Sequence, residues 1–423
     1  MTRSISGDRP VLIVGAGIGG LTTALALHQA GIPVRVLEGV RAIRPLGVGI
    51  NLLPHSVRIL TDLGVGPALA ATAIETAALA YFNKFGQAIW SEPRGLAAGY
   101  PVPQFSIHRG ELQWILYQAV EARLGSGAVM TSHELVRWED TGDEVRAVFV
   151  DRDTGRETAP IAGAALIGAD GIHSVVRRTM YPDEGPARFS GRTLWRAVTD
   201  AEPYLDGRTM VMIGHQRQKF VAYPISRVRA DRGRSLVNWI AELETGGDTP
   251  PRQDWSREVP KEVFAPAFAN WRFDWLDVPG IIAGAETVYE YPMVDRDPLP
   301  SWTRGRVTLL GDAAHAMYPI GSNGASQAIL DAAALTRRLV ESSDVPAALK
   351  RYEDDRLGPT AEVVLANRRN GPEQVMQIAE ERAPQGFAHI HDVIPRTELE
   401  EIAARYKRTA GFSPEQVRRE AVA

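Results

Sequence analysis

The sequence predicts an α/β protein with one large lobe of strand-helix-strand units, a second lobe built on another β-sheet, and a helical C-terminal region. A strand, a glycine turn, a helix and a second strand follow one another between Pro10 and Glu38. Another apolar strand at 306–310 leads into a long helical period at 325–340, so an element of the first lobe returns late in the chain. Between them, residues 193–239 form short extended runs rich in Trp, Tyr, Val and Met, which are typical of an antiparallel sheet.

The composition favours a small-molecule partner. With 423 residues the chain exceeds the roughly 250 to 300 residues of one core, so a large lobe and a smaller one are expected. Apolar residues make up 44% and charged residues 23%, as in soluble globular proteins. The net charge is -4 and the Lys and Arg residues are scattered, which argues against a nucleic-acid partner. Because cysteine is absent, disulfides, thiolate catalysis and cysteine-ligated metals are excluded.

No segment is expected to cross a membrane. Residues 1–10 are short and polar, and the apolar run at 11–14 is too brief for a signal peptide. The stretch 67–82 is interrupted by Glu75 and is shorter than the roughly 20 apolar residues needed to span a bilayer. A cytoplasmic location is therefore predicted, and no metal site is expected.

The glycine turn after the first strand is a dinucleotide-binding fingerprint. Gly15 makes the tight turn, Gly17 lets backbone approach a pyrophosphate, and Gly20 permits close helix packing. The following helix start can bind the anion. Glu38, at the end of the second strand, can accept hydrogen bonds from ribose hydroxyls and favours FAD or NAD over a 2′-phosphorylated dinucleotide. A Rossmann-like domain is therefore predicted, with a cofactor cradle of Gly15, Gly17, Ile18, Gly19, Gly20 and Glu38.

A second acidic turn lies within residues 166–177. There an apolar strand ends in Asp170 and Gly171, and a helix start containing Arg177 follows. Such a turn can contact a dinucleotide, but an Asp-Gly turn is also an ordinary way to end a strand. From this segment alone, the ordinary turn is the preferred interpretation.

A third segment places Gly311 and Asp312 after a strand and before a long helix. Asp312 can bind ribityl hydroxyls, and the amides at the next helix start can hold the negative charge of a reduced flavin ring. The alternative is an ordinary loop. His315 is expected to be a hydrogen-bonded structural residue rather than a general base. The residues expected at the reacting ring are Pro319, Gly321, Asn323 and Gly324, and those expected to bind cofactor here are Gly311, Asp312, Gly324 and Ala325.

Candidate substrate contacts come from the second lobe. Six residues on its extended segments can line an aromatic pocket: Trp195, Phe220, Tyr223, Trp239, Tyr291 and Met293. Since most such residues are core residues, two or three of them are expected to contact substrate. The predicted contacts are Trp195, Tyr223, Met293 and Pro319. Arg109, at a helix start, is a candidate contact to a flavin or its phosphates, with a solvated arginine as the alternative.

With these three segments in order, the chain resembles the group A aromatic-ring flavoprotein monooxygenases, the family of para-hydroxybenzoate hydroxylase. The resemblance spans residues 11–370 and rests on the fingerprint, the Asp-Gly segment and the late Gly-Asp segment. Three further stretches, at 43–51, 90–95 and 291–298, are similar to the phenazine-carboxylate hydroxylase branch. Those stretches suggest a planar aromatic substrate that is carboxylated or contains nitrogen.

The resemblance also implies roles for individual residues. Gly15, Gly17, Gly20 and Glu38 would bind the ADP half of FAD, and Gly49 would also contact the cofactor. Arg109 and Asp312 would contact the phosphate and ribityl parts, and Asp170 belongs to a motif tied to FAD and NAD(P)H. The loop from Pro319 to Ala325 would lie against the isoalloxazine ring.

The domain organisation that the resemblance implies is discontinuous. An FAD-binding lobe would comprise residues 1–76, 105–182 and 293–370, and a substrate lobe residues 77–104 and 183–292. Residues 371–423 would form a helical tail of open role.

The implied reaction is FAD- and NAD(P)H-dependent insertion of one oxygen atom from dioxygen into an aromatic or heteroaromatic small molecule, through a flavin hydroperoxide. The alternatives are an FAD oxidase or dehydrogenase that inserts no oxygen, and a non-catalytic FAD-fold binding protein. The substrate, the ring position, the choice of NADH or NADPH, and the choice of monomer or homodimer stay open.

Overall fold

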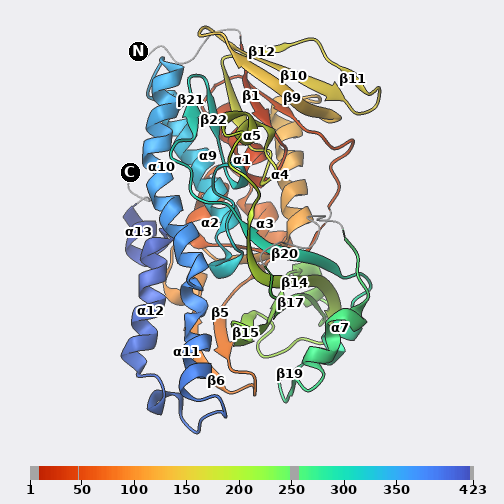
Figure 1. The fold of residues 1–423 in the computed structure, drawn as a ribbon, viewed down its shortest axis with the longest axis vertical. Coiled ribbons are helices and arrows are strands. Elements are labelled where there is room, and N and C mark those ends of the chain that lie inside the picture. Colours follow the sequence, from red (N-terminus) through yellow and green to blue (C-terminus); the bar gives the residue numbers. More distant parts are fainter. Residues whose placement is uncertain (1–8, 46, 248–256, 420–423) are drawn as a thin grey trace.

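The computed structural model describes residues 9–45, 47–247 and 257–419. In Figure 1 the fingerprint lobe lies above the second lobe, and the last long helices run along one side of both. The predicted α/β class, the second sheet and the helical C-terminal region are confirmed. Of the stretch 43–51, Leu46 lies outside the described residues.

A six-stranded sheet forms the centre of the first lobe. Five of its strands are parallel and only the edge strand β21 is antiparallel. The parallel strands are short and almost wholly buried, as expected for a sheet covered on both faces. In sheet order the strands are β21 (Thr303–Arg304), β22 (Val307–Leu309), β13 (Ala165–Gly168), β1 (Val11–Val14), β2 (Val34–Leu37) and β8 (Val129–Met130).

Helices from distant parts of the sequence pack against this sheet. Helix α1 follows the glycine turn and packs against both α4 and the late helix α9, which is how the discontinuous lobe forms one core. These helices are α1 (Ile18–Gln29), α2 (Pro54–Asp62), α3 (Gly66–Thr72), α4 (Arg109–Leu124), α5 (Val175–Met180), α8 (Asp312–His315), α9 (Gly324–Val340) and α10 (Val345–Arg368).

Two smaller antiparallel sheets complete the first lobe. One contains β9 (His133–Asp140), β10 (Val145–Asp151), β11 (Arg156–Glu157) and β12 (Ile161–Gly163), and the other contains β3 (Gly49–Leu52), β4 (Ile74–Glu75) and β7 (Phe105–His108). Strand β3 pairs with β7, so Asn51 and Ser106 lie opposite one another in the two strands.

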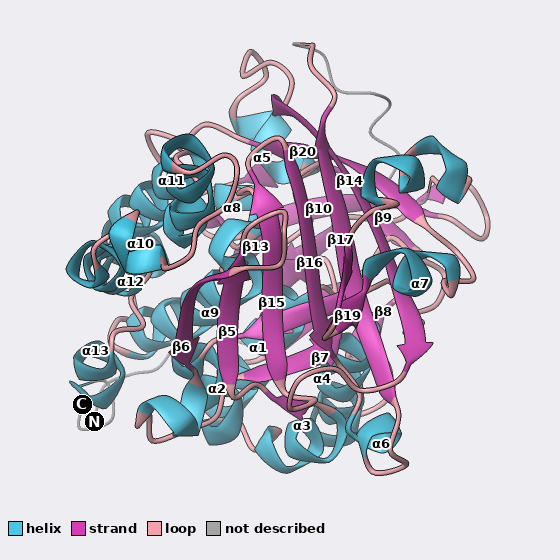
Figure 2. Cartoon of the chain, turned by 90° about the horizontal axis from the view of Figure 1, so that it is seen from below, coloured by secondary structure: helices cyan, strands magenta, loops and turns pink. Residues whose placement is uncertain are grey.

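The second lobe is a seven-stranded, mostly antiparallel sheet. Its order is β20 (Tyr289–Asp295), β14 (Arg188–Ala201), β17 (Ser235–Glu244), β16 (Gln218–Pro224), β15 (Thr209–His215), β5 (Ala78–Phe82) and β6 (Ala88–Pro93). Figure 2 shows these strands side by side, with α7 (Val278–Ala283) on one side of the sheet and the C-terminal helices on the other. The short elements α6 (Arg227–Ala230), β18 (Arg272–Phe273) and β19 (Leu276–Asp277) flank it. Strand β20 continues past the predicted lobe boundary at 292 and ends at Asp295.

The C-terminal tail joins both lobes. Its helices are α11 (Gln374–Arg382), α12 (Arg396–Thr409) and α13 (Pro414–Arg419). Met376 of α11 packs against the seven-stranded sheet, in a cluster that includes Met210 and Met212. Phe412, after α12, packs in a cluster with Leu53 of the first lobe. The tail is therefore part of the core and not an appendage.

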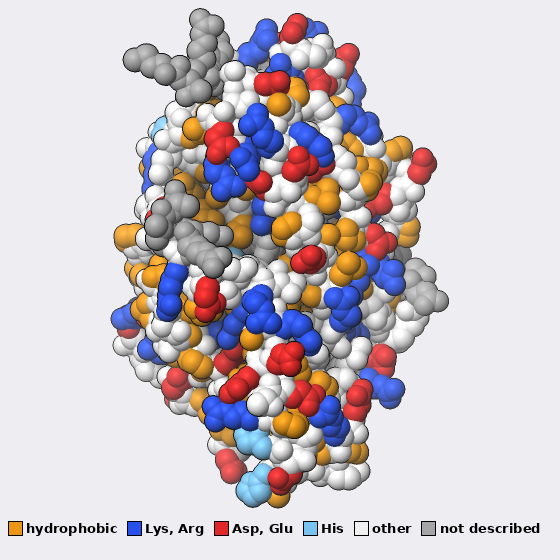
Figure 3. All heavy atoms as spheres, turned by 90° about the vertical axis from the view of Figure 1, so that its left-hand side faces the viewer, with side chains coloured by type: hydrophobic (Ala, Val, Ile, Leu, Met, Phe, Trp, Pro, Cys, Tyr) orange, Lys and Arg blue, Asp and Glu red, His pale blue; other side chains and the backbone are white. Residues whose placement is uncertain are grey.

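The surface carries mixed charge. On the face in Figure 3, on the side of the C-terminal helices, cationic and anionic side chains are interspersed rather than gathered by sign. Among the described residues, no helix is long and apolar enough to cross a bilayer.

The contact between α2 and the tail predicts acid sensitivity. The ring of buried His55 lies 5.7 Å from that of Phe412, and burial, with the positive charge of Arg356, lowers the pKa of His55 to about 3. Unfolded histidine takes up a proton near pH ~6.5. Below that pH, His55 is protonated in the unfolded state and neutral in the folded state. Each further unit of acidification therefore lowers the unfolding free energy by about 1.4 kcal/mol, until the pH nears the folded-state pKa of about 3.

We expect His55→Leu to flatten the fall in unfolding free energy between about pH 6.5 and pH 5. Urea denaturation across this range measures it. His28→Leu, at an exposed position of α1, is the control. Equal slopes in the two variants would contradict the prediction.

Candidate active site

The three sequence segments meet at one edge of the parallel sheet. Val14 is in register with Leu37 on one side and with Gly168 on the other, and Gly168 is in register with Leu309. The fingerprint, Glu38, the Asp-Gly turn and the Gly-Asp turn come directly after these four residues. The carboxyl edge of such a sheet, where the connections diverge to either side of β1, is where doubly wound folds bind ligands.

The three fingerprint glycines differ in the space around them. At Gly15, φ is +104° and a Cβ would lie 2.5 Å from the carbonyl oxygen of Ala169. At Gly20 a Cβ would lie 2.0 Å from the carbonyl oxygen of Gly15. A Cβ at Gly17, by contrast, would meet no atom within 4 Å. The first and third glycines allow close packing, and the second leaves open space on the cavity side, as a pyrophosphate requires.

Glu38 holds the glycine loop. Its Oε2 accepts a hydrogen bond from the amide of Ala16 at 2.7 Å, and its Oε1 accepts one from the amide of Val40 at 2.9 Å. Each carboxylate oxygen has a second lone pair. The side chain can therefore keep the loop in place and still accept hydrogen bonds from ribose hydroxyls.

Asp170 presents an unsatisfied oxygen to the site. Its Oδ2 accepts from the amide of Val175 at 2.7 Å, while its buried Oδ1 has no hydrogen-bond partner. Burial raises the pKa of Asp170, although hydrogen bonds from Ser174 and the backbone oppose the shift. A buried acceptor without a donor is costly, so a hydroxyl of a bound cofactor fits this position. This observation favours the functional interpretation of the turn.

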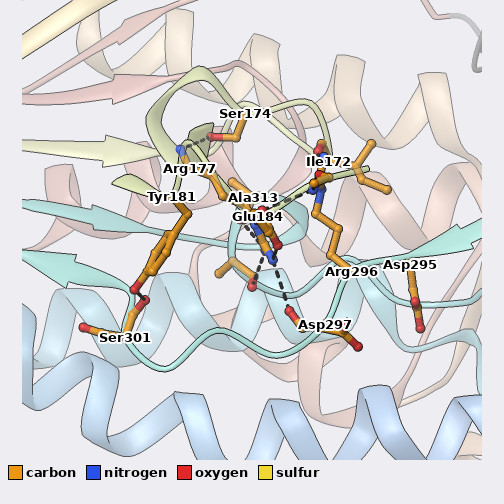
Figure 4. Close-up of polar contacts among 12 residues, drawn as sticks. Ile172, Ser174, Arg177, Tyr181, Glu184, Asp295, Arg296, Asp297, Ser301 and Ala313 are labelled. Carbon is orange, nitrogen blue, oxygen red and sulfur yellow. Dashed lines mark hydrogen bonds and ion pairs between the residues drawn. The ribbon is translucent and has the colours of Figure 1, made fainter. Parts of the chain in front are cut away.

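Arg177 connects the Asp-Gly turn to the Gly-Asp turn. Its guanidinium is buried, donates to the carbonyl oxygens of Ala313 and Ala314 at 3.1 and 2.9 Å, and pairs with Glu184. Figure 4 shows this arrangement, with Arg296, which directly follows β20, pairing with the same Glu184. Because the two accepting carbonyls belong to α8, which begins at Asp312, one arginine fixes both acidic turns relative to each other.

The Gly-Asp turn is braced from behind by a buried triad. Asp331 accepts hydrogen bonds from the amide of Gly311 at 3.0 Å and from Nε2 of His315 at 2.6 Å, and it pairs with Arg356 at 2.8 Å. Burial alone would raise the pKa of Asp331, but His315 and Arg356 outweigh it and hold the pKa at about 2. His315 is thus hydrogen-bonded and structural, as expected, and Asp312 starts α8 with its side chain exposed at the cavity.

The loop before α9 contributes four of its predicted residues to the cavity. Gly321 does not line it, because it lies against Tyr406 of the tail. Helix α9 has 17 residues and no acidic side chain in its first turn, and its positive end lies at the cavity. The lining residues are Pro319, Asn323, Gly324 and Ala325.

One cavity of about 540 Å³ connects this edge with the seven-stranded sheet. Gly17, Asp170 and Asp312 line its first-lobe part, and Arg109, with an exposed side chain, lines it beside them. Gly49 lies at the junction, where its amide donates to Asn238 at 2.6 Å. A Cβ at Gly49 would lie 2.6 Å from the Cβ of Asn238, so the two lobes approach closely at this glycine.

The aromatic candidates divide between the two faces of the sheet. Tyr223, Tyr291 and Met293 line the cavity. Phe220 and Trp239 face the opposite core, as does Trp195, whose ring stacks on Phe264 at 5.0 Å and whose Nε1 donates to Glu290. The prediction that Trp195 contacts substrate is therefore wrong. Successive side chains of a strand point to opposite faces, and its neighbours Leu194 and Arg196 take the cavity side.

A charged cluster at the cavity was missed in the sequence: Lys219, Glu242 and Glu373 line the cavity, and Arg192 pairs with Glu242 without lining it. Lys219 pairs with Glu242 at 2.9 Å and with Glu373 at 2.5 Å, and Arg192 pairs with the other oxygen of Glu242 at 2.8 Å. Arg192, Lys219 and Glu242 alternate with the aromatic core residues of β14, β16 and β17, which is the signal that would have placed them. Glu373 comes from the start of the tail and carried no such signal.

Comparison with known proteins identifies the family. Residues 8–367 match the family model described as "FAD binding domain". The chain belongs to this family. Among relatives in it, phenazine 1,6-dicarboxylic acid hydroxylase PhzS of Lysobacter antibioticus is 48% identical over 374 residues, covering 87% of this chain and 91% of that protein. The 3-hydroxybenzoate 6-hydroxylase 1 of Aquipseudomonas alcaligenes is 32% identical over 369 residues, covering 85% and 87%.

Solved structures show the same FAD binding domain fold. A salicylate hydroxylase substrate complex has a TM-score of 0.73 at 22% identity, over 97% of each chain. HpxO of Klebsiella pneumoniae, complexed with FAD and uric acid, has a TM-score of 0.73 at 23% identity, also over 97% of each chain. The resemblance to flavoprotein monooxygenases is confirmed. The protein is an FAD-dependent aromatic monooxygenase with NAD(P)H as its reductant. The individual site roles stay predictions.

The open space above Gly17 gives a direct test of the cradle. Because φ at Gly17 is -73° and no atom lies within 4 Å of a Cβ there, we expect Gly17→Leu to fold. Its side chain would fill the position of the pyrophosphate and abolish FAD retention. Visible absorption of the purified protein measures this.

The control is Gly358→Leu, at an exposed position of α10 that also has no neighbour within 4 Å. We expect it to retain FAD like the parent. If Gly17→Leu kept the flavin content of the parent, the assignment of Gly17 to the pyrophosphate site would be wrong.

Proposed function

We propose that this flavoprotein hydroxylates a flat, fused-ring heteroaromatic carboxylate of the phenazine class. The proposal rests chiefly on the two-part cavity, in which the nucleotide cradle continues into an apolar chamber that ends in a buried lysine, Lys219. The name of the 48% identical relative, a phenazine 1,6-dicarboxylic acid hydroxylase, supports the same substrate class.

The chamber suits a planar apolar ring system. One wall is the cavity side of the seven-stranded sheet, and Pro319 faces it from the loop before α9. Apolar walls exclude water from the reacting atoms, which oxygenation requires if the oxidant is not to decay unproductively. The apolar side chains of this wall are Leu194, Met210, Met212, Val221, Ile240 and Met293.

The charged cluster on the cavity side of the sheet offers a substrate one hydrogen-bond donor, not a net positive charge. The two cations Arg192 and Lys219 are balanced by Glu242 and Glu373, so the formal charge of the cluster is zero. Burial alone would lower the pKa of Lys219, but the two carboxylates raise it above its ordinary value, and the ammonium stays protonated. It has three N–H groups and two carboxylate partners, which leaves one donor for a substrate carboxylate or ring oxygen.

Tyr223 provides a second fixed polar group. It lines the cavity, follows Lys219 in β16 and lies next to Gly49, where its ring edge would be 2.8 Å from a Cβ. Burial raises its pKa to about 12. The phenol therefore stays protonated at neutral pH and can donate a hydrogen bond. Lys219 and Tyr223 together can fix the orientation of a flat ring within the apolar chamber.

Bound FAD would supply the redox chemistry, in which electrons from NAD(P)H and an oxygen atom from dioxygen are delivered to the substrate ring. The chain would bind the cofactor through Gly17, Glu38, Asp170 and Asp312. The positive end of α9, at Gly324, would stabilise negative charge on the reduced ring. Lys219 would bind the substituent of the substrate.

A direct test uses the FAD-loaded protein with NADPH or NADH, a phenazine carboxylate and isotopically labelled dioxygen. We expect the substrate to accelerate NAD(P)H oxidation, and the product to gain one labelled oxygen atom by mass spectrometry. An oxidised product without label would establish an oxidase or dehydrogenase. A protein that cannot retain FAD would be a binding module.

The role of Lys219 predicts a specific change in substrate affinity. A hydrogen bond to a charged group contributes about 1.5 to 3 kcal/mol. We therefore expect Lys219→Met to raise KM for a phenazine carboxylate roughly 10- to 100-fold, with FAD affinity unchanged. Steady-state kinetics and an FAD titration measure the two quantities.

Lys84→Met is a matched control. Lys84 likewise pairs with a tail glutamate, Glu380, at 2.6 Å, but it does not line the cavity. We expect its KM to equal that of the parent. An unchanged KM in Lys219→Met, or an equal rise in both variants, would contradict the assigned role.

A further inference from the structure

Tyr406 of the tail contacts the loop before α9 through its hydroxyl. Tyr406 of α12 is 5% exposed, and its hydroxyl accepts a hydrogen bond from Nδ2 of Asn323 at 2.9 Å. The same hydroxyl donates to Oδ1 of Asn367 at 2.7 Å. Asn323 and Asn367 are both wholly buried, so solvent does not compete for these bonds.

The tyrosine ring also determines the course of the loop. A Cβ at Gly321 would lie 2.0 Å from the Tyr406 hydroxyl, and φ at Gly321 is +69°. A Cβ at Gly371 would lie 2.8 Å from the edge of the same ring. Two glycines thus make room for one side chain, and the loop follows its contour.

The contacts of Tyr406 involve Asn323, which stands at the start of α9. Asn323 is the N-cap residue of α9, and asparagine is among the best capping side chains. Here it makes no capping hydrogen bond. Its Nδ2 donates to the Tyr406 hydroxyl and to the carbonyl oxygen of Gly321, and its Oδ1 accepts from Nε2 of Gln327 at 3.3 Å.

We propose that Tyr406 is a positioning residue of the active site, whose hydroxyl holds the Asn323 side chain away from the end of α9 and keeps the first amides of that helix open to the flavin. The inference rests on the flavin-binding role proposed above for the loop at 319–325. It gives the C-terminal tail a part in the site, although the tail lies beyond the matched family range.

The physical reason is competition for the same amides. The first N–H groups of a helix have no partner within the helix, and a side-chain cap satisfies one of them. If Asn323 capped α9, it would occupy a donor and place a carboxamide over Gly324 and Ala325, which line the cavity. The bond to Tyr406 keeps the side chain in its other orientation.

Tyr406→Phe removes the hydroxyl and keeps the ring that packs against Gly321. We expect the Kd for FAD to rise about tenfold, because one cofactor-binding amide is lost, and the visible absorption bands of bound FAD to shift. Tyr100→Phe is the matched control, since the buried Tyr100 hydroxyl also bonds the tail, to the carbonyl oxygen of Phe412 at 2.6 Å, but touches no part of the loop. We expect parental values of both quantities for the control.

A second comparison separates positioning from general stability. In an Asn323→Ala background no side chain is left to cap α9, so adding Tyr406→Phe should leave FAD affinity and spectrum unchanged. If Tyr406→Phe does not fold, Asn367→Ala takes its place in both comparisons; it removes the shorter of the two hydrogen bonds that the hydroxyl can donate, and the other is to the carbonyl oxygen of Ile320 at 3.3 Å.

The outcomes are distinct. A change in Tyr406→Phe that is absent from Tyr100→Phe and disappears with Asn323→Ala supports the inference. Equal behaviour of the two tyrosine variants, or the same loss with and without Asn323, overturns it while leaving the proposed function intact. A parent protein that binds no FAD overturns the proposed function and this inference with it.

Discussion

The parallel register of β2, β1, β13 and β22 places the ends of four distant chain segments on one line. Each strand is only three or four residues long, so a shift by a single pair would move an acidic turn several ångströms from the others. Arg177 and the Asp331 triad then fix the two late turns against each other from behind the site. The cofactor cradle depends on this alignment, and its glycines serve it differently: Gly15 and Gly20 allow the backbone to close, and Gly17 keeps the space open.

The second lobe meets the cradle through the two-residue alternation of its sheet. One face carries a stacked aromatic core that includes Trp195, Phe220 and Trp239. The other carries the apolar chamber wall and the charged group around Lys219. The neighbours of these aromatic residues on the same strands form the chamber wall. We therefore expect substrate selection to depend on these neighbours rather than on the aromatic residues.

The C-terminal tail contacts both parts of the site. Glu373, at its start, neutralises Lys219 on the substrate side, and Tyr406, further along, contacts the loop that faces the flavin. Both contacts are buried in a medium of low dielectric. Polar interactions are stronger there than in water, and a polar group that loses its partner is destabilising. A segment outside the matched family range thus takes part in both the chamber and the loop, and related chains with other tails can be expected to differ at these points.

The sequence by itself determined the fold class and the cofactor, and it predicted the residues of the cradle. These depend on local rules: a glycine turn between a strand and a helix, and an acidic residue at a strand end, look the same in any protein that binds a dinucleotide. Only the tertiary structure decided which side chains face the chamber. Trp195 looked like a substrate contact and proved to be core, because its direction follows from the pairing of β14 with β17 and not from its chemistry. Glu373 and Tyr406 could not be found at all, since they reach the site by packing across distances of 154 and 83 residues in the chain, and no local pattern encodes such a contact.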